Sequence, residues 1–175
     1  ILLMKIMVIA DQWELLCKGG LIDEILRLGY EVLCVLPDSE SYADDKCKGK
    51  KNNLKFYFIP KKKGMFLTIF IRIIIHCLMV YKVFKPEKIL YYLTQGSLTT
   101  GFVFRFFKGT PVSVITGRLK FLKGSKGFWY SKNCKYILSY AKNVFFTYKD
   151  DYDNIDRYKL RCKDKSILLR SWGVD

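Results

Sequence analysis

"KIMVIADQWELLCKGGLIDEILRLGYEVLCVL", residues 5–36, is the stretch of sequence that decides the fold. It begins and ends with short apolar runs, Lys5–Ala10 and Glu31–Leu36, in which apolar side chains stand at consecutive rather than alternate positions. Strands of this composition are buried on both faces, which is typical of a parallel sheet covered by helices. The segment between the two runs is long enough for a helix, and Gly29 stands where that helix should end. The stretch therefore predicts a strand, a helix and a second, parallel strand.

The same alternation continues to the end of the chain. Segments long enough for helices separate most of the later apolar runs, and Pro86 and Gly109 stand where helices should end. A chain of 175 residues can sustain one sizeable core. We therefore expect an α/β fold, a Rossmann-like parallel sheet of about seven strands with helices on both faces. The later strands are expected at Leu54–Ile59, Lys88–Leu93, Pro111–Ile115, Asn143–Thr147 and Ser166–Leu169.

The segment "MFLTIFIRIIIHCLMVYKVF", Met65–Phe84, allows three interpretations. It is close to the ~20 residues that span a bilayer, but Arg72 and His76 fall near its middle, where polar and charged side chains are costly. The flanking strands and the following Pro86 favour a long amphipathic helix, buried in the α/β layer, with His76 near the surface of the packing. The third interpretation is a helix that lies on a membrane surface. We expect the buried helix.

The formal charge of +15 implies an anionic partner, which is a nucleic acid, a membrane surface or a phosphorylated substrate. A nucleic-acid-binding domain should carry basic residues along one recognition helix or aromatic residues on an exposed sheet, and neither pattern is present. The six cysteines are widely spaced, without a C-x-x-C pair, which argues against a zinc site and favours a reducing compartment. The apolar first ten residues lack the basic region and the cleavage site of a secretory signal.

Open parallel sheets bind ligands beyond the carboxyl ends of their strands, so the loops that follow the strands are the candidate sites. The loop after the fifth expected strand, "TGRLKFLKGSKG", interleaves basic with large apolar residues. Such a mixture suits an anionic lipid surface, where rings enter the headgroup boundary and amines meet phosphate. The alternative is a solvated basic loop whose aromatic rings fold back into the core. The membrane-facing residues of the first interpretation are Lys120, Phe121, Lys123, Lys126, Phe128 and Trp129.

Two further features are weak indications of a site. Because neither G-x-G-x-x-G nor G-K-[ST] occurs, Gly19 and Gly20 fit a helix opening or a close contact between helix and sheet better than a nucleotide-binding loop. Asp150, Asp151 and Asp153 stand near the start of a helix, whose positive end they favour, and they need no catalytic role. The residues alone therefore lead to a basic Rossmann-like domain with an anionic partner.

The stretch "KIMVIADQWELLCKGGLIDEILRLGYEVLCVLPDSE" resembles the opening of the amino-terminal domain of family 4 glycosyltransferases, which have the GT-B fold. Within that family it is most similar to the branch that works on lipid-linked bacterial surface glycans. The resemblance extends to "KPEKILYYLTQG", beside the "KPDIVHTH" type stretch of relatives, to "TGRL", beside their "TGLG" turn, and to "RSWGVD", beside "PGEGVD". Two departures stand out, since Gln95 is near where relatives often carry His and Arg118 interrupts the glycine-rich turn.

The resemblance implies that residues 4–175 are the acceptor-side half of a retaining glycosyltransferase, without the carboxy-terminal domain that binds the donor. Such an enzyme moves a sugar from a nucleotide-sugar to a lipid-linked or surface-polysaccharide acceptor, with no cofactor and no metal. Because the nucleotide-sugar is held mainly by the other domain, this chain alone would be inactive. Arg118 would contact a phosphate or, because it departs from the family's turn, would be a solvent-facing loop arginine. The substrate-binding residues implied are Lys18, Gly19, Gly20, Thr94, Gln95, Gly96, Thr116, Gly117 and Arg118.

The implied partners are a lipid-linked saccharide acceptor, an anionic membrane surface and a donor-binding domain or subunit, and no nucleic acid. The expected location is cytoplasmic, peripheral on the inner face of the plasma membrane. An alternative function is a non-catalytic subunit of a split glycosyltransferase, which recruits a donor-binding partner to the membrane. The chain would then be a separately encoded half rather than a shortened protein.

Overall fold

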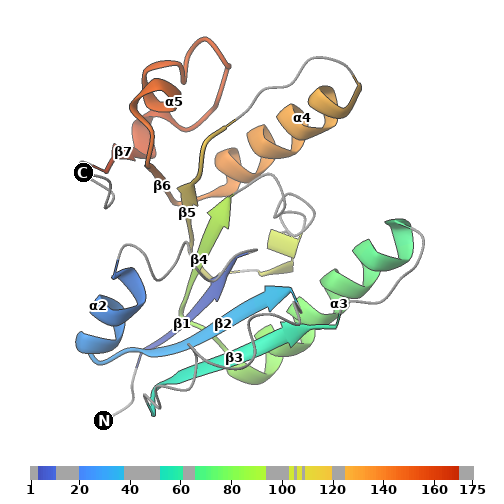
Figure 1. Ribbon diagram of the computed structural model, residues 1–175, viewed down its shortest axis with the longest axis vertical. Helices are drawn as coiled ribbons and strands as arrows, with labels where there is room; N and C mark the ends of the chain where they lie inside the picture. Colours follow the sequence, from blue (N-terminus) through green and yellow to red (C-terminus); the bar gives the residue numbers. More distant parts are fainter. Residues whose placement is uncertain are drawn as a thin grey trace. The chain divides into compact units, whose positions relative to one another are not determined.

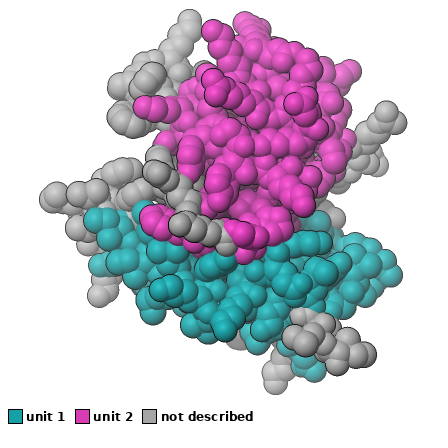
Figure 2. Space-filling view, turned by 180° about the vertical axis from the view of Figure 1, so that it is seen from behind, with its two compact units in different colours: residues 1–89 teal, residues 90–175 magenta. Residues whose placement is uncertain are grey.

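The computed structural model describes residues 4–10, 20–37, 52–60, 66–93, 103–104, 106–107, 109–119 and 125–169 (Figure 1). At Pro37 and in residues 66–70 and 125–130 it describes the backbone alone. The chain divides into two compact units, residues 1–89 and residues 90–175, which Figure 2 distinguishes by colour. The described residues form one sheet of seven strands, in the order β3-β2-β1-β4-β5-β6-β7. This arrangement confirms the expected Rossmann-like parallel sheet.

Unit 1 contains the strands β1 (Lys5–Ile9), β2 (Glu31–Pro37) and β3 (Leu54–Ile59), and β4 (Lys88–Leu93) begins in it. β1 pairs with β2 and β2 with β3, and both pairs are parallel. The helix α2 (Leu21–Arg27) packs against β2, and the long helix α3 (Phe66–Phe84) packs against β3. The strand order runs one way from β1 to β2 and the other way from β3 to β4, so right-handed crossovers place α2 and α3 on opposite faces.

Unit 2 contains the strands β5 (Val112–Thr116), β6 (Asn143–Phe146) and β7 (Ser166–Leu168), again in parallel pairs. Its helices are α4 (Ser125–Tyr140), the short α5 (Lys149–Asp153) and a 3₁₀ turn, η2 (Lys163–Lys165). α5 packs against β6 and β7. β5 therefore leads through α4 into β6, and β6 leads through α5 and η2 into β7.

All seven expected strands are present within one residue of their expected bounds. β5 begins at Val112 rather than at Pro111, because proline has no N–H group to donate to the ladder. β1 and β2 are buried on both faces, as their consecutive apolar residues predict, and neighbours such as Met7 and Val8 are inaccessible to solvent. Unit 2 has its own aromatic contact, in which the rings of Tyr91 and Phe104 meet edge to face at 4.7 Å.

The helices of unit 1 end where the sequence places a glycine or a proline. Gly29 follows α2 with φ 84, and its N–H donates to the carbonyl of Leu26. α3 ends at Phe84, where Lys85 takes a positive φ of 51 ahead of Pro86. A residue before proline is disfavoured in the helical region, so this junction ends the helix sharply.

The four cysteines of the described segments, Cys34, Cys77, Cys134 and Cys162, are buried, and none is in a disulfide. Burial raises the pKa of Cys77 and of Cys134 to about 12. A thiol with so high a pKa remains protonated at neutral pH and behaves as a small apolar side chain. These four cysteines therefore belong to the packing of the strands and helices.

The carboxyl end of α4 is held by a lysine from a distant part of the chain. The Nζ of Lys165 donates a hydrogen bond of 2.6 Å to the carbonyl of Ser139 and a second to that of Ala141. The last carbonyls of a helix have no partner within the helix, and the negative end of the helix dipole favours a cation there. Desolvation of the amine lowers the pKa of Lys165. Lys165 thus joins η2 to the end of α4 and to Ala141, which follows that helix.

Replacing Lys165 by methionine should lower the free energy of unfolding by about 1–2 kcal/mol, because the carbonyls of Ser139 and Ala141 lose a charged donor while the aliphatic packing is kept. Urea unfolding followed by circular dichroism measures the change. Lys163→Met is the matched control, since Lys163 pairs with Asp156 in an exposed ion pair, which contributes little. Equal midpoints for the two variants would show that Lys165 does not clamp the helix end.

Candidate functional site

The segment Thr116–Leu119 leaves the carboxyl end of β5, where ligands of open α/β sheets bind. Thr116 is the last residue of the strand and is fully buried. Its carbonyl accepts a 2.6 Å hydrogen bond from the hydroxyl of Thr147, at the end of β6. The N–H of Gly117 donates to the carbonyl of Leu93, the last residue of β4, at 2.9 Å. The backbone of this loop is therefore fastened to the ends of both neighbouring strands.

A buried carboxylate fixes the next residues of the same loop. Asp151, in the first turn of α5, is only 5% exposed, and its Oδ2 accepts a hydrogen bond of 2.9 Å from the N–H of Leu119. Leu119 itself is buried. Because the N–H of Leu119 and the apolar side chain are both held, the loop has little freedom at the point where Arg118 projects from it.

The surroundings of Asp151 act on its pKa in opposite directions. Burial is the largest effect and raises the pKa of this carboxyl above its ordinary value. The Leu119 N–H and the guanidinium of Arg118 lower it, while the neighbouring carboxylate of Asp150 raises it again. The charged form of Asp151 is therefore expensive to bury, and the loop backbone and Arg118 offset part of that cost.

Arg118 is the cation that this arrangement presents to solvent. It is exposed, between the buried Gly117 and Leu119, and the carbon of its guanidinium lies 5.9 Å from the centre of the Tyr148 ring. Tyr148 immediately precedes α5 and is itself partly exposed. A guanidinium offers a planar set of N–H donors that matches two oxygens of a phosphate or a carboxylate. The loop can thus bind an anionic oxygen group at the carboxyl end of β5.

The structure describes only some of the other residues that are expected in the site. Lys18, Gly19, Thr94, Gln95 and Gly96 lie outside the described residues, as do Lys120, Phe121 and Lys123. Lys126, Phe128 and Trp129 fall in the first turns of α4, of which the backbone alone is described. Gly20 is the N-cap of α2 in the left-handed conformation, with φ 62, which is the helix opening that we expect for this glycine. Thr116, Gly117 and Arg118 are brought together at β5.

Sequence reasoning missed the role of Asp151. It places Asp150 and Asp151 at the start of a helix, which is correct, and assigns them only to the helix dipole. The strand order supplies the missing signal, because β6 pairs with β5 and the residues that follow the two strands must meet at one edge. Within the described segments no group of histidine, cysteine and acidic residues could hold a metal ion.

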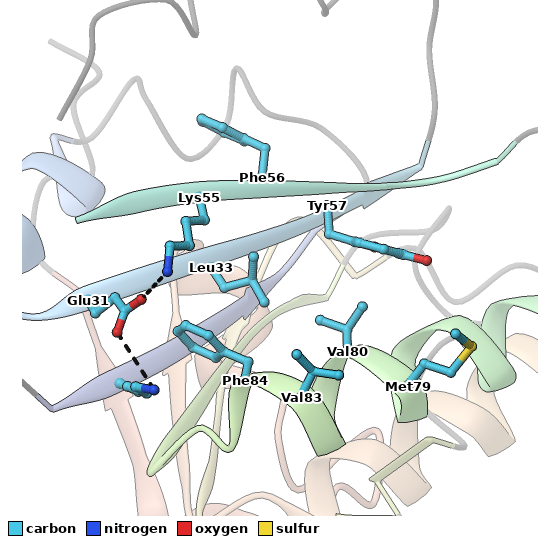
Figure 3. Close-up of a pocket in the computed structure, with 10 residues that line it drawn as sticks. Glu31, Leu33, Lys55, Phe56, Tyr57, Met79, Val80, Val83 and Phe84 are labelled. Atoms are coloured by element: carbon cyan, nitrogen blue, oxygen red, sulfur yellow. Dashed lines mark hydrogen bonds and ion pairs between the residues drawn. The ribbon is translucent and has the colours of Figure 1, made fainter. Parts of the chain in front are cut away.

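A second concave surface lies in unit 1, at the amino ends of β1, β2 and β3 (Figure 3). This groove has a volume of about 590 Å³ and an apolar wall from α3 that includes Val80 and Phe84. At its polar end the carboxylate of Glu31 pairs with Lys55 at 2.7 Å and with Lys5 at 3.8 Å. The groove therefore combines aliphatic and aromatic walls with two lysines that share one carboxylate.

His76, on α3, meets the side chain of Tyr57, which also lines this groove. The hydroxyl of Tyr57 is hydrogen-bonded to Nδ1 of His76, and the two rings lie 5.8 Å apart in a tilted arrangement. His76 is half-buried, as expected for a helix residue near the surface of the packing. This contact attaches the middle of α3 to β3.

No protein-family model matches the chain, and no curated protein matches it in sequence. Among solved structures, a UDP-GlcNAc 2-epimerase from Neisseria meningitidis, bound to UDP-GlcNAc, aligns with 98% of this chain and 48% of its own at a TM-score of 0.72 and 16% identity. A glycosyltransferase from Rickettsia africae aligns with 97% of this chain and 43% of its own, at a TM-score of 0.68 and 10% identity. A sucrose-phosphate synthase structure from Thermosynechococcus elongatus aligns over 97% of this chain and 91% of its own, also at 0.68 and 10%.

These similarities establish the fold. The neighbours are proteins of the GT-B glycosyltransferase fold, and the match covers nearly all of the chain. The chain spans about half the length of the 2-epimerases that it matches. The seven-stranded sheet is therefore a Rossmann-like domain of the kind from which GT-B proteins are built.

The raised pKa of Asp151 predicts how stability depends on pH. A carboxyl whose pKa is higher in the folded than in the unfolded state stabilises the fold below its unfolded pKa, and this contribution is lost as the pH rises through the folded pKa. Asparagine keeps an oxygen for the Leu119 N–H and removes the buried charge. Asp151→Asn should therefore be more stable than the wild type at pH 7, and its advantage should shrink as the pH falls toward about 4.

Thermal unfolding at several pH values measures this difference. Asp153→Asn, which removes an exposed carboxylate from the same helix, controls for the change in net charge. An Asp151→Asn protein that is less stable than the wild type at pH 7 would mean that the attraction of Arg118 outweighs the cost of burial.

Proposed function

We propose that this chain is the acceptor-side half of a retaining glycosyltransferase that resembles family 4 enzymes and acts on a lipid-linked saccharide. The observation that carries the proposal is an exposed guanidinium, Arg118, on a rigidly held loop at the carboxyl end of β5 in a GT-B type sheet. The family resemblance of the sequence supports the same assignment, because "TGRL" lies at the position of the family's glycine-rich turn.

Arg118 is proposed to bind the diphosphate that links the saccharide to its lipid. Charged hydrogen bonds from a planar guanidinium hold a phosphate in position as well as in orientation. Asp151 is a positioning residue, since it holds the N–H of Leu119 and does not itself face the ligand. Fixing the acceptor in this way keeps its hydroxyl ready for attack when the nucleotide-sugar arrives, which removes much of the entropic barrier.

In this proposal the nucleotide-sugar binds mainly to a second domain or subunit, and the 175-residue chain alone does not transfer sugar. The acceptor's lipid also requires a membrane. We infer a peripheral attachment to the inner face of the plasma membrane, through the basic and aromatic residues Lys120, Phe121, Lys123, Lys126, Phe128 and Trp129. The formal charge of +15 supports an anionic surface as the partner.

The chain should bind a polyprenyl-diphosphate-linked saccharide, and Arg118→Ala should weaken this binding about tenfold, as expected for the loss of a charged hydrogen bond. Binding is measured in detergent micelles by the change in tryptophan fluorescence. Arg157→Ala is the matched control, because it removes another exposed arginine of unit 2. A matched polyprenol that lacks diphosphate and saccharide should bind equally weakly to both proteins.

Equal affinity of the wild type and Arg118→Ala for the diphosphate-linked saccharide would remove Arg118 from the site. Sugar transfer by the purified 175-residue chain from any nucleotide-sugar would contradict the half-enzyme assignment.

A further inference from the structure

The helix α3 exposes a row of large aliphatic side chains. Ile71, Ile75, Met79 and Val83 are 47%, 50%, 56% and 84% exposed, respectively. They stand four residues apart, so they form one continuous strip along the helix. Single exposed aliphatic side chains are ordinary on protein surfaces, whereas a contiguous apolar patch indicates an interaction.

The opposite side of the same helix packs into unit 1. Cys77, Val80 and Phe84 are buried, and Val80 and Phe84 face β2 and β3 across the groove of Figure 3. A surface helix of a globular protein normally turns a charged face to water. α3 is apolar on its buried side and on its exposed side, so the expected burial of this helix holds for one side alone.

The charges that interrupt the exposed strip are basic. With about 100° of rotation per residue, Arg72 and Lys82 each lie about 40° from the middle of the strip in projection down the helix axis, on opposite sides of it. Lys82 is exposed, and the exposed Lys85 follows the end of the helix. The helix sequence Phe66–Phe84 contains no aspartate and no glutamate. Aliphatic side chains interleaved with cations on one face characterise a helix that lies in the interface of an anionic membrane.

The groove extends this apolar surface into the protein. Met79 and Val83 belong to the exposed strip and also line the groove, whose polar end holds Lys5 and Lys55 around the single carboxylate of Glu31 (Figure 3). The strip is therefore continuous with further apolar walls, and the charged cluster at the polar end of the groove carries one positive charge in excess.

We propose that the exposed face of α3, formed by Ile71, Ile75, Met79 and Val83, rests on the surface of an anionic lipid bilayer, with Arg72 and Lys82 among the phosphate headgroups. No helix in the described part of the chain is long and apolar enough to cross a membrane, so α3 lies along the surface. The formal charge of +15 makes an anionic bilayer a better match than an apolar protein partner. The residues of this face are different from those of the Lys120–Trp129 segment, and the proposal does not depend on sugar transfer.

Co-sedimentation with vesicles tests the proposal on the full chain. Vesicles of phosphatidylglycerol and phosphatidylcholine should bind the protein more tightly than phosphatidylcholine alone, and added salt should weaken the binding. Replacing Ile75 and Val83 together by glutamine should lower the partition coefficient about tenfold or more, because two aliphatic side chains no longer enter the interface. Lys82→Gln should lower it about fivefold.

Matched controls separate this face from general effects. Leu28→Gln removes an isolated aliphatic side chain of unit 1 that is 57% exposed, and Lys142→Gln removes an exposed lysine of unit 2. Both should bind vesicles as the wild type does. The α3 variants should keep the wild-type melting temperature, because the replaced side chains face outward.

Vesicle binding by the α3 variants that equals the wild type would overturn the proposal, whatever the other surfaces do. If Lys120→Gln/Lys123→Gln/Lys126→Gln then loses the binding, the membrane contact belongs to that segment alone. The proposal would also be overturned if the wild-type protein did not bind anionic vesicles but formed dimers, and the α3 variants did not dimerise. The strip would then be an interface between two copies of the chain. The α3 variants should still bind the saccharide diphosphate in detergent, which distinguishes a failure here from a failure of the proposed enzyme.

Discussion

Parallel strands cannot be joined by tight turns, because each new strand must start at the edge of the sheet where the previous one started. Every connection therefore crosses a face of the sheet, and the crossing segment covers that face. This constraint explains why Met7 and Val8 of β1 are both inaccessible to solvent, although they point to opposite faces. It also brings the carboxyl ends of β5 and β6 to one edge, where Asp151 meets the backbone of Leu119.

Because parallel strands need connections that cover the sheet, much of the fold can be predicted from the sequence. A strand buried on both faces needs apolar residues at consecutive positions, and β1, β2 and β4 carry that pattern. Helix ends are readable where backbone geometry demands a special residue, as at Gly29, which has a positive φ after α2. Pro111 shows the limit of the pattern, because the ring fits the apolar run but contributes no donor, so β5 begins one residue later.

Two features could not be read from the sequence, for different physical reasons. In the sequence, Asp151 has the position of an acidic residue in the first turn of a helix. Its carboxylate instead accepts a hydrogen bond from a backbone N–H that lies 32 residues away in the chain. The exposed face of α3 could not be predicted because this helix is apolar on its buried and on its exposed side. When apolar residues surround a helix on all sides, hydrophobic periodicity cannot show which side meets the sheet. Only packing distinguishes Val80, which is buried, from Val83, which is the most exposed of the aliphatic strip.

The candidate site and the aliphatic strip use charge in different ways. Arg118 is a single guanidinium over the ring of Tyr148, on a loop that Asp151 holds through the N–H of Leu119. Its affinity for an anion therefore depends on a fixed geometry that a bidentate anion can match. The cations of α3 need no such geometry, because a lipid surface offers many equivalent phosphates and each cation contributes only about 1 kcal/mol. The exposed aliphatic side chains add an attraction that salt does not screen, while the cations select anionic lipid. Since neither contribution is large alone, attachment through α3 would be reversible, and its strength would follow the number of exposed aliphatic and basic residues on that face rather than any one contact.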